Sequence, residues 1–291
     1  MKTVSLIGSK GFIGKHLEYY LRSRGFQVVG YDVIPGEDNN YVQCDISNRD
    51  EIERICLDVD YIYMFAGLTG TRIGFDKYRD FTIINELGLN NLLDAIRRSS
   101  YRPRIIFPSS RLVYKGKEHP LSEDAEKETK TIYAVNKIAC ENLLYSYSNM
   151  FGIPYTIFRI CVPFGNMLAN DYSFGTIGTF IRQAQERNRI TLYGDGKVKR
   201  TFTSMEDLCR QIELVSLSSD SENQIFNIGG CAHTLYEVAK EIADYYSATL
   251  DLTPFPDDDR RIESGSTFFD STKIERLTKY SSYQDVSTLF K

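Results

Sequence analysis

Short apolar runs alternate with longer amphipathic segments through roughly the first 160 residues of the chain. The apolar runs of strand length are 4–7, 27–31, 60–65, 104–107 and 155–160. The segments with helical spacing of apolar residues include 12–24, 82–98 and 131–150. Strands separated by helical crossovers pair in parallel, and the helices then cover both faces of the sheet. The pattern therefore predicts an α/β fold built on a doubly wound parallel sheet.

Beyond residue 162 the pattern changes. Segment 166–178 is rich in Gly, Asn, Ser and aromatic residues and predicts a loop. The predicted later elements are helices 179–187, 205–217, 234–246 and 271–277, strands 190–193, 224–228 and 250–253, and a turn at 194–196. We expect strand 224–228 to rejoin the large sheet. The predicted division is a domain of residues 1–162 with 205–228, and a smaller C-terminal α/β substrate-binding region of residues 163–204 with 229–291, packed as one unit around a cleft.

Composition and charge argue against several kinds of partner. The 291 residues are 42% hydrophobic and 25% charged, which is typical of a globular protein. The net charge of −4 gives no reason to expect nucleic acid or an anionic membrane as a partner. No apolar stretch reaches the ~20 residues of a membrane helix, and the N-terminus is unlike a signal peptide. We therefore expect a cytoplasmic protein.

Cysteines and histidines give no sign of a metal site. The cysteines show neither metal-ligand spacing nor a disulfide pattern, so we expect buried thiols in a reducing compartment. The six cysteines are Cys44, Cys56, Cys140, Cys161, Cys209 and Cys231. Because His16, His119 and His233 are scattered along the chain, no metal site is predicted.

A glycine-rich turn lies between strand 4–7 and helix 12–24. Gly8 permits a tight turn, Gly11 lets the backbone approach a pyrophosphate, and Gly14 lets the helix pack close to the sheet. The helix N-terminus would then face the phosphates with free N–H groups and a positive dipole. This arrangement predicts a Rossmann-type dinucleotide site. The expected cofactor contacts in the turn are Gly8, Lys10, Gly11, Phe12, Ile13 and Gly14.

An acidic residue, Asp32, ends the second predicted strand. A carboxylate there accepts hydrogen bonds from the adenosine ribose hydroxyls and repels a 2′-phosphate. The following residues, 33–35, offer no cation, so NAD is expected rather than NADP. Asp45 and Ile46 follow the next short strand and could flank the adenine. Alternatively, Asp45 is the N-cap of a helix over 47–55.

Tyr133 and Lys137 are four residues apart on a predicted helix and should share one face. An ammonium beside a phenol stabilises the phenolate, so we expect a lowered tyrosine pKa. Such a tyrosine can exchange a proton with a sugar hydroxyl or ketone. Together with the glycine turn and Ser109–Ser110, the pair predicts a nicotinamide site with a tyrosine acid/base.

At this point the chain resembles an extended short-chain dehydrogenase/reductase of the nucleotide-sugar epimerase/dehydratase type over nearly its whole length. Beyond the glycine turn, Asp32 and Asp45, the matching segments are Phe65-Ala66-Gly67 under the cofactor, 85–93, 109–114, Tyr133 to Lys137, 192–196, 200–202 and 270–273. The resemblance implies that the Ser110 hydroxyl bonds the reacting sugar oxygen while Tyr133 moves the proton. It also implies that Lys137 holds the nicotinamide ribose.

Departures from the family pattern argue against two of the family's reactions, dehydration and decarboxylation. The 4,6-dehydratases of the family have Asp-Glu after the catalytic hydroxyl, and the decarboxylases keep the Glu, but here Arg111 and Leu112 follow. Val162 stands where the family usually has an Asn near the substrate phosphates. Arg111 is expected to bind an anionic or strongly polar sugar group. Arg200, Arg260 and Arg261 are candidate cations for a substrate diphosphate, and surface arginines are the alternative.

The resemblance implies an NAD-dependent epimerase of a nucleotide-diphosphate sugar, acting at sugar carbon 4 through transient oxidation to a keto sugar. A 4-keto-6-deoxy nucleotide-sugar reductase is the alternative. A non-catalytic NAD-binding sensor is disfavoured because both Tyr133 and Lys137 are present. Related proteins form homodimers through the helices equivalent to 82–98 and 131–150. Here those helices carry apolar residues on more than one face: Leu87, Leu92, Ile138, Leu143 and Leu144.

Overall fold

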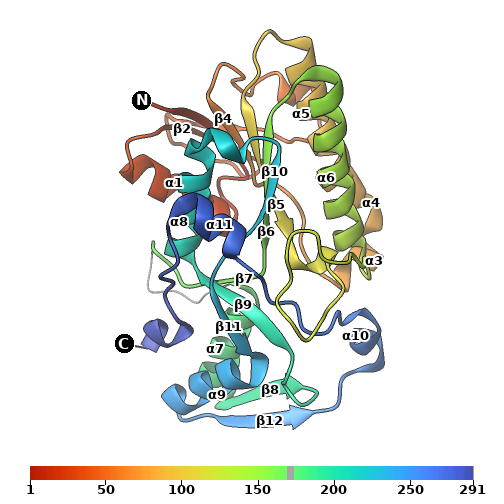
Figure 1. Ribbon diagram of the computed structural model, residues 1–291, viewed down its shortest axis with the longest axis vertical. Helices are drawn as coiled ribbons and strands as arrows, with labels where there is room; N and C mark the ends of the chain where they lie inside the picture. Colours follow the sequence, from red (N-terminus) through yellow and green to blue (C-terminus); the bar gives the residue numbers. More distant parts are fainter. Residues whose placement is uncertain (169–173, 291) are drawn as a thin grey trace.

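A computed structural model describes residues 1–168 and 174–290 of the chain. Within these residues, seven strands form one parallel sheet in the order β10-β6-β5-β4-β1-β2-β3 (Figure 1). The strands are β1 (Thr3–Ile7), β2 (Gln27–Asp32), β3 (Tyr41–Gln43), β4 (Tyr61–Met64), β5 (Arg104–Ser110), β6 (Tyr155–Ile160) and β10 (Gln224–Asn227). Strand β10 pairs in parallel with β6, as the sequence predicted.

Helices cover both faces of this sheet, which explains why its central strands are buried along their length. Every residue of β4 and of β6 is buried. One face packs against α1 (Phe12–Ser23), α8 (Met205–Leu217) and α11 (Thr272–Thr278). The other packs against α2 (Arg49–Ile52), α5 (Gly88–Arg98) and α6 (Ile132–Phe151). In Figure 1 the two helical layers flank the sheet on opposite sides.

The first half of the predicted helix 82–98 has an unusual form. Residues Thr82–Leu87 form a π-helix, η1, which continues directly into α5. Short helices α3 (Ile73–Asp76) and α4 (Tyr78–Phe81) precede it. Within η1 the buried Asn85 side chain accepts a hydrogen bond from Leu68 N at 2.7 Å and donates one to Leu68 O at 3.1 Å. This π-helix therefore fastens the loop that follows β4.

A smaller region lies below the large sheet in Figure 1. Among the described residues it contains a three-stranded sheet, β11-β9-β7, and a parallel pair, β12-β8. Its strands are β7 (Val162–Phe164), β8 (Arg189–Tyr193), β9 (Lys199–Ser204), β11 (Cys231–Thr234) and β12 (Thr249–Thr253), and its helices are α7 (Gly175–Arg187), α9 (Leu235–Tyr246) and α10 (Asp257–Ile262). Apolar residues of α7, α9 and β9 form its own core, including Phe180, Phe202 and Val238.

The predicted α/β fold with a doubly wound parallel sheet is confirmed. Differences are local: β5 extends three residues beyond the predicted 104–107, and α7 begins at Gly175 rather than at 179. The central residues 169–173 of the predicted loop 166–178 lie outside the described part of the chain. Strands β7, β9 and β11 were not predicted. The division into 1–162 with 205–228 and 163–204 with 229–291 stays a proposal.

Helices η1, α5 and α6 present a different apolar surface from the one expected. Leu92 and Leu144 are buried in the core of the chain itself, and Ile138 and Leu143 pack partly against that core. Leu87 remains 46% exposed. The exposed large apolar side chains of these three helices are Ile83, Leu87, Val135, Tyr145 and Met150. Within residues 1–168 and 174–290, no helix is long and apolar enough to cross a membrane.

Candidate active site

A cavity of about 650 Å³ opens at the carboxyl ends of β1, β4, β5 and β6. The order of the strands reverses beside β1, since β2 lies on one side of it and β4 on the other. Such a point is where parallel α/β sheets bind ligands, because the connections diverge and leave a crevice. Segment 160–163 and the first residues of α7 complete the lining on the side of the smaller region.

The glycine turn has the shape that a dinucleotide pyrophosphate requires. Gly8 has φ +88°, and a Cβ on it would lie 2.4 Å from the Ala66 nitrogen. A Cβ on Gly14 would lie 1.9 Å from the Gly8 oxygen. Gly11 is the N-cap of α1, where no side chain caps the helix and no acid stands in the first turn. The positive end of α1 thus stays available to an anion, and the residues present fit a bound dinucleotide.

Asp32 ends β2 next to this turn. Its carboxylate accepts hydrogen bonds from Lys10 N at 2.9 Å and from Ile34 N at 3.2 Å. The Lys10 ammonium lies 4.5 Å from the ring centroid of Tyr41, whose hydroxyl donates to the Asp32 carbonyl at 3.0 Å. A cation therefore stands beside this strand end. Residues 33–35 offer no cation, as the sequence predicted, but Lys10 of the glycine turn does.

Asp45 and Ile46 have local structural contacts. The Asp45 carboxylate accepts hydrogen bonds from Ser47 N at 2.9 Å and Ser47 Oγ at 2.7 Å. Helix α2 begins at Arg49 and is capped by Asn48, so Asp45 is not its N-cap. Ile46 is buried, and a Cβ on Gly88 would lie 2.7 Å from its Cδ1 atom. The predicted cofactor residues outside the described cavity lining are Gly8, Lys10, Asp32, Asp45 and Ile46.

The structure brings Ser110, Tyr133 and Lys137 together on the cavity wall. Ser110 ends β5, while Tyr133 and Lys137 share one face of α6 with the ammonium 5.6 Å from the phenol ring centroid. A hydrogen bond joins Ser110 to Tyr133. The Lys137 ammonium donates to the Pro108 carbonyl at 2.6 Å. These three side chains can bind one hydroxyl or carbonyl group and exchange a proton with it.

The pKa of Tyr133 is raised, rather than lowered as expected. Burial raises the pKa of Tyr133 above its usual range, and the hydrogen bond to Ser110 acts in the opposite direction. Burial also lowers the pKa of Lys137 to about 8. Because the ammonium is directed to the Pro108 carbonyl, removal of both groups from water outweighs their mutual attraction.

A buried ion pair that sequence reasoning missed supports the end of β5. Ser109 Oγ donates to Glu141 Oε1 at 2.5 Å. Arg159 donates to both oxygens of Glu141, at 2.6 and 3.0 Å, and to Tyr114 Oη at 2.8 Å. The available signal was spacing, since Glu141 follows Lys137 by one helical turn and shares its face of α6. This network holds Ser109, and with it the backbone of Ser110, in place.

Of the arginines predicted to bind the substrate, one lines the cavity and three do not. Arg111 lines the cavity and donates to Thr267 Oγ1 at 3.1 Å. Arg200 is 2% exposed and forms an ion pair with Glu263 at 2.7 Å, so it is not part of the described lining. Burial and the nearby Arg111 lower the pKa of Arg200 to about 10. The remaining two candidates, Arg260 and Arg261, are exposed on α10 away from the lining.

The wall of the cavity lacks acidic groups. Among the described residues that line it, there is no aspartate, glutamate or histidine. Val162, where the family usually has an asparagine, contributes an apolar surface. The protonatable side chains on the wall are Ser109, Ser110, Arg111, Tyr133, Lys137, Cys161, Thr69, Thr71 and Thr176. Tyr133, Lys137 and Ser110 are therefore the groups on the described wall that sequence analysis predicted to transfer a proton.

A sequence model of the NAD dependent epimerase/dehydratase family matches residues 4–229. The chain belongs to this family. The predicted family, the enzyme class and the dependence on NAD are thereby confirmed. The matched segment contains the glycine turn, Asp32 and the side chains of Ser110, Tyr133 and Lys137.

Individual relatives are named for nucleotide sugars. The "uncharacterized UDP-glucose epimerase YtcB" of Bacillus subtilis is 26% identical over 299 residues, covering 95% of this chain and 92% of that protein. The UDP-N-acetyl-alpha-D-glucosaminuronate decarboxylase of Bacillus cytotoxicus is 27% identical over 258 residues, covering 83% and 79%. The solved UDP-glucuronic acid 4-epimerase of Bacillus cereus superposes with a TM-score of 0.84 at 23% identity, covering 99% and 96%, and shows the same fold.

Proposed function

We propose that this chain is a nucleotide-sugar 4-epimerase that works through a transient keto sugar with tightly held NAD. The observation that carries the proposal is the combination of Ser110, Tyr133 and Lys137 with a described cavity wall free of carboxylates. Elimination of water in the related dehydratases uses acids at the positions of Arg111 and Leu112. Epimerisation needs no such acid, because one proton relay serves both directions.

Ser110, Tyr133 and Lys137 have different roles in the proposed reaction. Ser110 orients the sugar oxygen, and Tyr133 takes its proton during oxidation and returns it during reduction. In the resting protein Tyr133 is a phenol, which suits protonation of the keto oxygen. The oxidation step needs the phenolate, which the Ser110 hydrogen bond and the Lys137 ammonium stabilise. NAD, when held by the glycine turn, supplies the hydride acceptor and donor for the sugar carbon.

The substrate side of the cavity favours an anion. Arg111 is the arginine on the described cavity wall, while the neighbouring Arg200 lies behind it and is neutralised by its ion pair with Glu263. Arg111 is therefore proposed to bind the diphosphate or an acidic group of the sugar. Several relatives are named for such compounds, including UDP-glucuronate 4-epimerase of Thermodesulfobacterium geofontis at 26% identity.

The proposal is tested by incubating the purified protein with UDP-glucose and, separately, with UDP-glucuronic acid, each with and without added NAD. Proton NMR should show the 4-epimer accumulating from at least one of them, while Tyr133→Phe, the matched control, should form it at least about 100-fold more slowly. Retained NAD in the purified protein is also expected. A pentose product, a dehydrated keto sugar, or consumption of one reduced cofactor per product would identify decarboxylase, dehydratase or reductase chemistry instead.

A homodimer through η1, α5 and α6 is part of the proposal. Leu87 and Tyr145 are exposed on these helices, where a partner would cover them. Light scattering should give twice the mass of one chain at micromolar concentration. Leu87→Glu should shift the protein to monomer. The matched control is Leu217→Glu, at an exposed leucine of α8 outside this surface. A monomeric wild-type protein would exclude the dimer.

A further inference from the structure

Cys231, His233 and Asp285 form a cluster of potential metal ligands outside the cavity. Cys231 and His233 are two residues apart in β11, so both side chains point to the same face of the strand. Asp285 comes from the segment just before the final short helix η4 (Val286–Phe290). The three ligand atoms all lie within 4.8 Å of one another, and His233 Nε2 is 2.6 Å from Asp285 Oδ2.

The donor set and its spacing suit a zinc ion. A thiolate, an imidazole and a carboxylate are ligands that zinc accepts together, and at ordinary bond lengths its ligand atoms lie about 3 to 4 Å apart. Small side-chain rotations reach that spacing from the observed one. The second oxygen of Asp285 accepts a hydrogen bond from Ser287 N at 3.1 Å, which orients the carboxylate as outer-shell contacts do in metal sites.

The same three residues do not form a nucleophilic triad. In a triad the imidazole stands between the thiol and the carboxylate so that it can take the thiol proton. Here His233 Nε2 faces Asp285 Oδ2 at 2.6 Å, and the Cys231 thiol donates to the backbone carbonyls of Tyr283 and Gln284, each at 3.9 Å, rather than to the imidazole. The thiol, the imidazole and the carboxylate still converge within 4.8 Å of one another, which is the arrangement that a single cation needs.

We propose that Cys231, His233 and Asp285 bind one zinc ion, with water at the fourth position. The His233 and Asp285 side chains are 30% and 37% exposed, which leaves room for water and an entry path. As the zinc bonds form, the thiol loses its proton to solvent, the His233 Nε2 proton moves to Nδ1 or to solvent, and no electron is transferred. The ion ties the C-terminal segment to β11. The same segment already contacts α8, since Gln284 N donates to Asp207 Oδ2 at 2.7 Å.

Zinc binding is measured by calorimetry after treatment with a chelator, using zinc chloride in a non-chelating buffer. The wild-type chain should bind one equivalent. Cys231→Ser and His233→Ala should each weaken binding by more than about tenfold. Asp285→Asn keeps an oxygen for the Ser287 N–H and should weaken it less. Cys56→Ser, at an exposed free cysteine elsewhere, is the matched control and should bind like wild type.

Cobalt(II) gives a second readout that identifies the sulfur ligand. Wild type and Cys56→Ser should develop a thiolate-to-cobalt charge-transfer band, and Cys231→Ser should not. Zinc should also slow tryptic cleavage after Lys279 in wild type and leave the cleavage rate of Cys231→Ser unchanged. Absence of a one-to-one complex in the wild type, or equal affinity in Cys231→Ser and His233→Ala, would overturn the proposal.

Discussion

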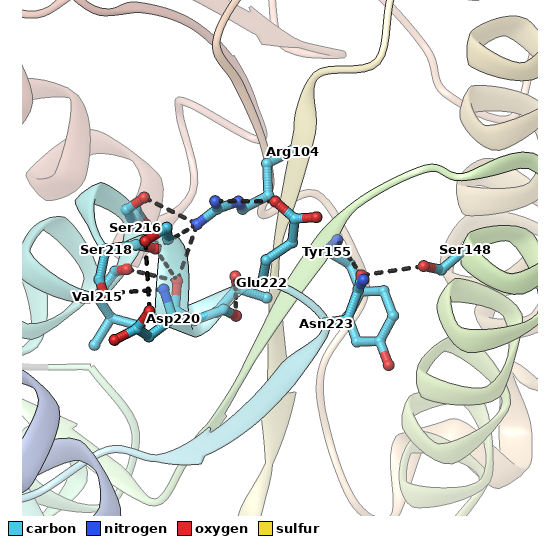
Figure 2. A network of polar contacts seen from close by, with 12 residues as sticks. Arg104, Ser148, Tyr155, Val215, Ser216, Ser218, Asp220, Glu222 and Asn223 are labelled. Carbon is cyan, nitrogen blue, oxygen red and sulfur yellow. Dashed lines mark hydrogen bonds and ion pairs between the residues drawn. The ribbon is translucent and has the colours of Figure 1, made fainter.

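The polar side chains at the two ends of the seven-stranded sheet differ in what surrounds them. At the carboxyl end, the glycine turn and the wall formed by Ser110 and Tyr133 leave a cavity of about 650 Å³. At the amino end of the same strands, side chains from distant segments bond to one another (Figure 2). The comparison therefore distinguishes side chains that face a cavity from side chains that stabilise the fold by bonding to one another.

Arg104, the first residue of β5, is the centre of the amino end. Its guanidinium donates to the carbonyls of Ser216 at 3.2 Å and Ser218 at 2.8 Å, and to Ser221 Oγ at 3.0 Å, and it pairs with Glu222 at 3.3 Å. Figure 2 shows the guanidinium directed into the turn that follows α8. The turn that leads to β10 is thereby fixed.

Asn223 completes the amino end on the other side of Figure 2. It has φ 56°, and its backbone N donates to Tyr155 O at 2.6 Å. Its side-chain oxygen accepts from Ser148 Oγ at 3.1 Å and Tyr155 N at 3.2 Å. The N-terminus of β6, the end of α6 and the start of β10 are thus joined without any ligand. Substitutions at the two ends should therefore have separable effects.

The largest effect is expected at the carboxyl end. Tyr133→Phe removes one oxygen and keeps the ring, so folding and NAD binding should survive while turnover falls by ~100- to 10,000-fold. Ser110→Ala should also cost rate with NAD still bound, and the two losses should not add, because the residues act as one relay. Turnover measured beside NAD affinity checks this. Near wild-type turnover of Tyr133→Phe would show that another group is the acid/base.

The buried Lys137 should lower the free energy of unfolding at neutral pH. Its folded pKa of about 8 is below the ordinary 10.5, so between these pH values the unfolded chain binds more protons and the free energy of unfolding rises with pH. Below pH 8 the lowered pKa of Lys137 reduces the free energy of unfolding by its full amount, about 3 kcal/mol. Lys137→Met should therefore be more stable than wild type at neutral pH, less so near pH 10, and inactive with weakened NAD binding.

Urea denaturation of both proteins between about pH 7 and about pH 10 measures this difference. Lys130→Met, at a partly exposed lysine just before α6, is the matched control and should show no such pH-dependent gain. A constant stability difference between wild type and Lys137→Met across this range would contradict a lowered lysine pKa.

At the amino end, Arg104→Met should lower stability and leave chemistry alone. The aliphatic stem stays, but the carbonyls of Ser216 and Ser218 lose their donor, which costs about 2 kcal/mol. Turnover per folded molecule should match wild type. The control Arg49→Met breaks an exposed pair with Asp94 and should cost less than about 1 kcal/mol. A loss of turnover in folded Arg104→Met would mean that the two ends are coupled.

The smallest effect concerns the choice of cofactor. Calorimetry should show tighter binding of NAD than of NADP, because the Asp32 carboxylate repels a 2′-phosphate. Asp32→Asn should reduce the preference by about tenfold, since the Lys10 ammonium near Tyr41 then meets the phosphate unopposed. Glu37→Gln, at an exposed neighbouring acid, is the control. Tighter NADP binding by the wild type would contradict the role given to Asp32.

Local patterns were readable from the sequence and distant contacts were not. The spacing of Gly8, Gly11 and Gly14, and that of Tyr133 and Lys137, follows from one turn and one helix, so the structure agrees with it. The ion pair of Arg200 with Glu263 joins residues 63 apart in sequence. No periodicity encodes such a pairing, so Arg200 was expected at the diphosphate.

Contacts between distant segments also decide the pKa of Tyr133 and the make-up of the metal-ligand cluster, so neither could be predicted from the sequence. Whether Lys137 stabilises a phenolate depends on what else its ammonium touches, and the Pro108 carbonyl is 29 residues away along the chain. Cys231 and His233 are close in sequence, but the third member of their cluster, Asp285, is 52 residues beyond His233. Both facts arise only when separate segments are packed.

The π-helix η1 makes the number of residues between 82 and 87 as important as the Asn85 side chain that it carries. A π turn contains one residue more than an α turn, so everything after it is rotated by about 100° from where an uninterrupted α-helix would place it. Deleting one residue there would restore α-helical bonding but turn Asn85 relative to α5, away from Leu68. The length of this segment is therefore fixed by the same two hydrogen bonds that fix the Asn85 side chain.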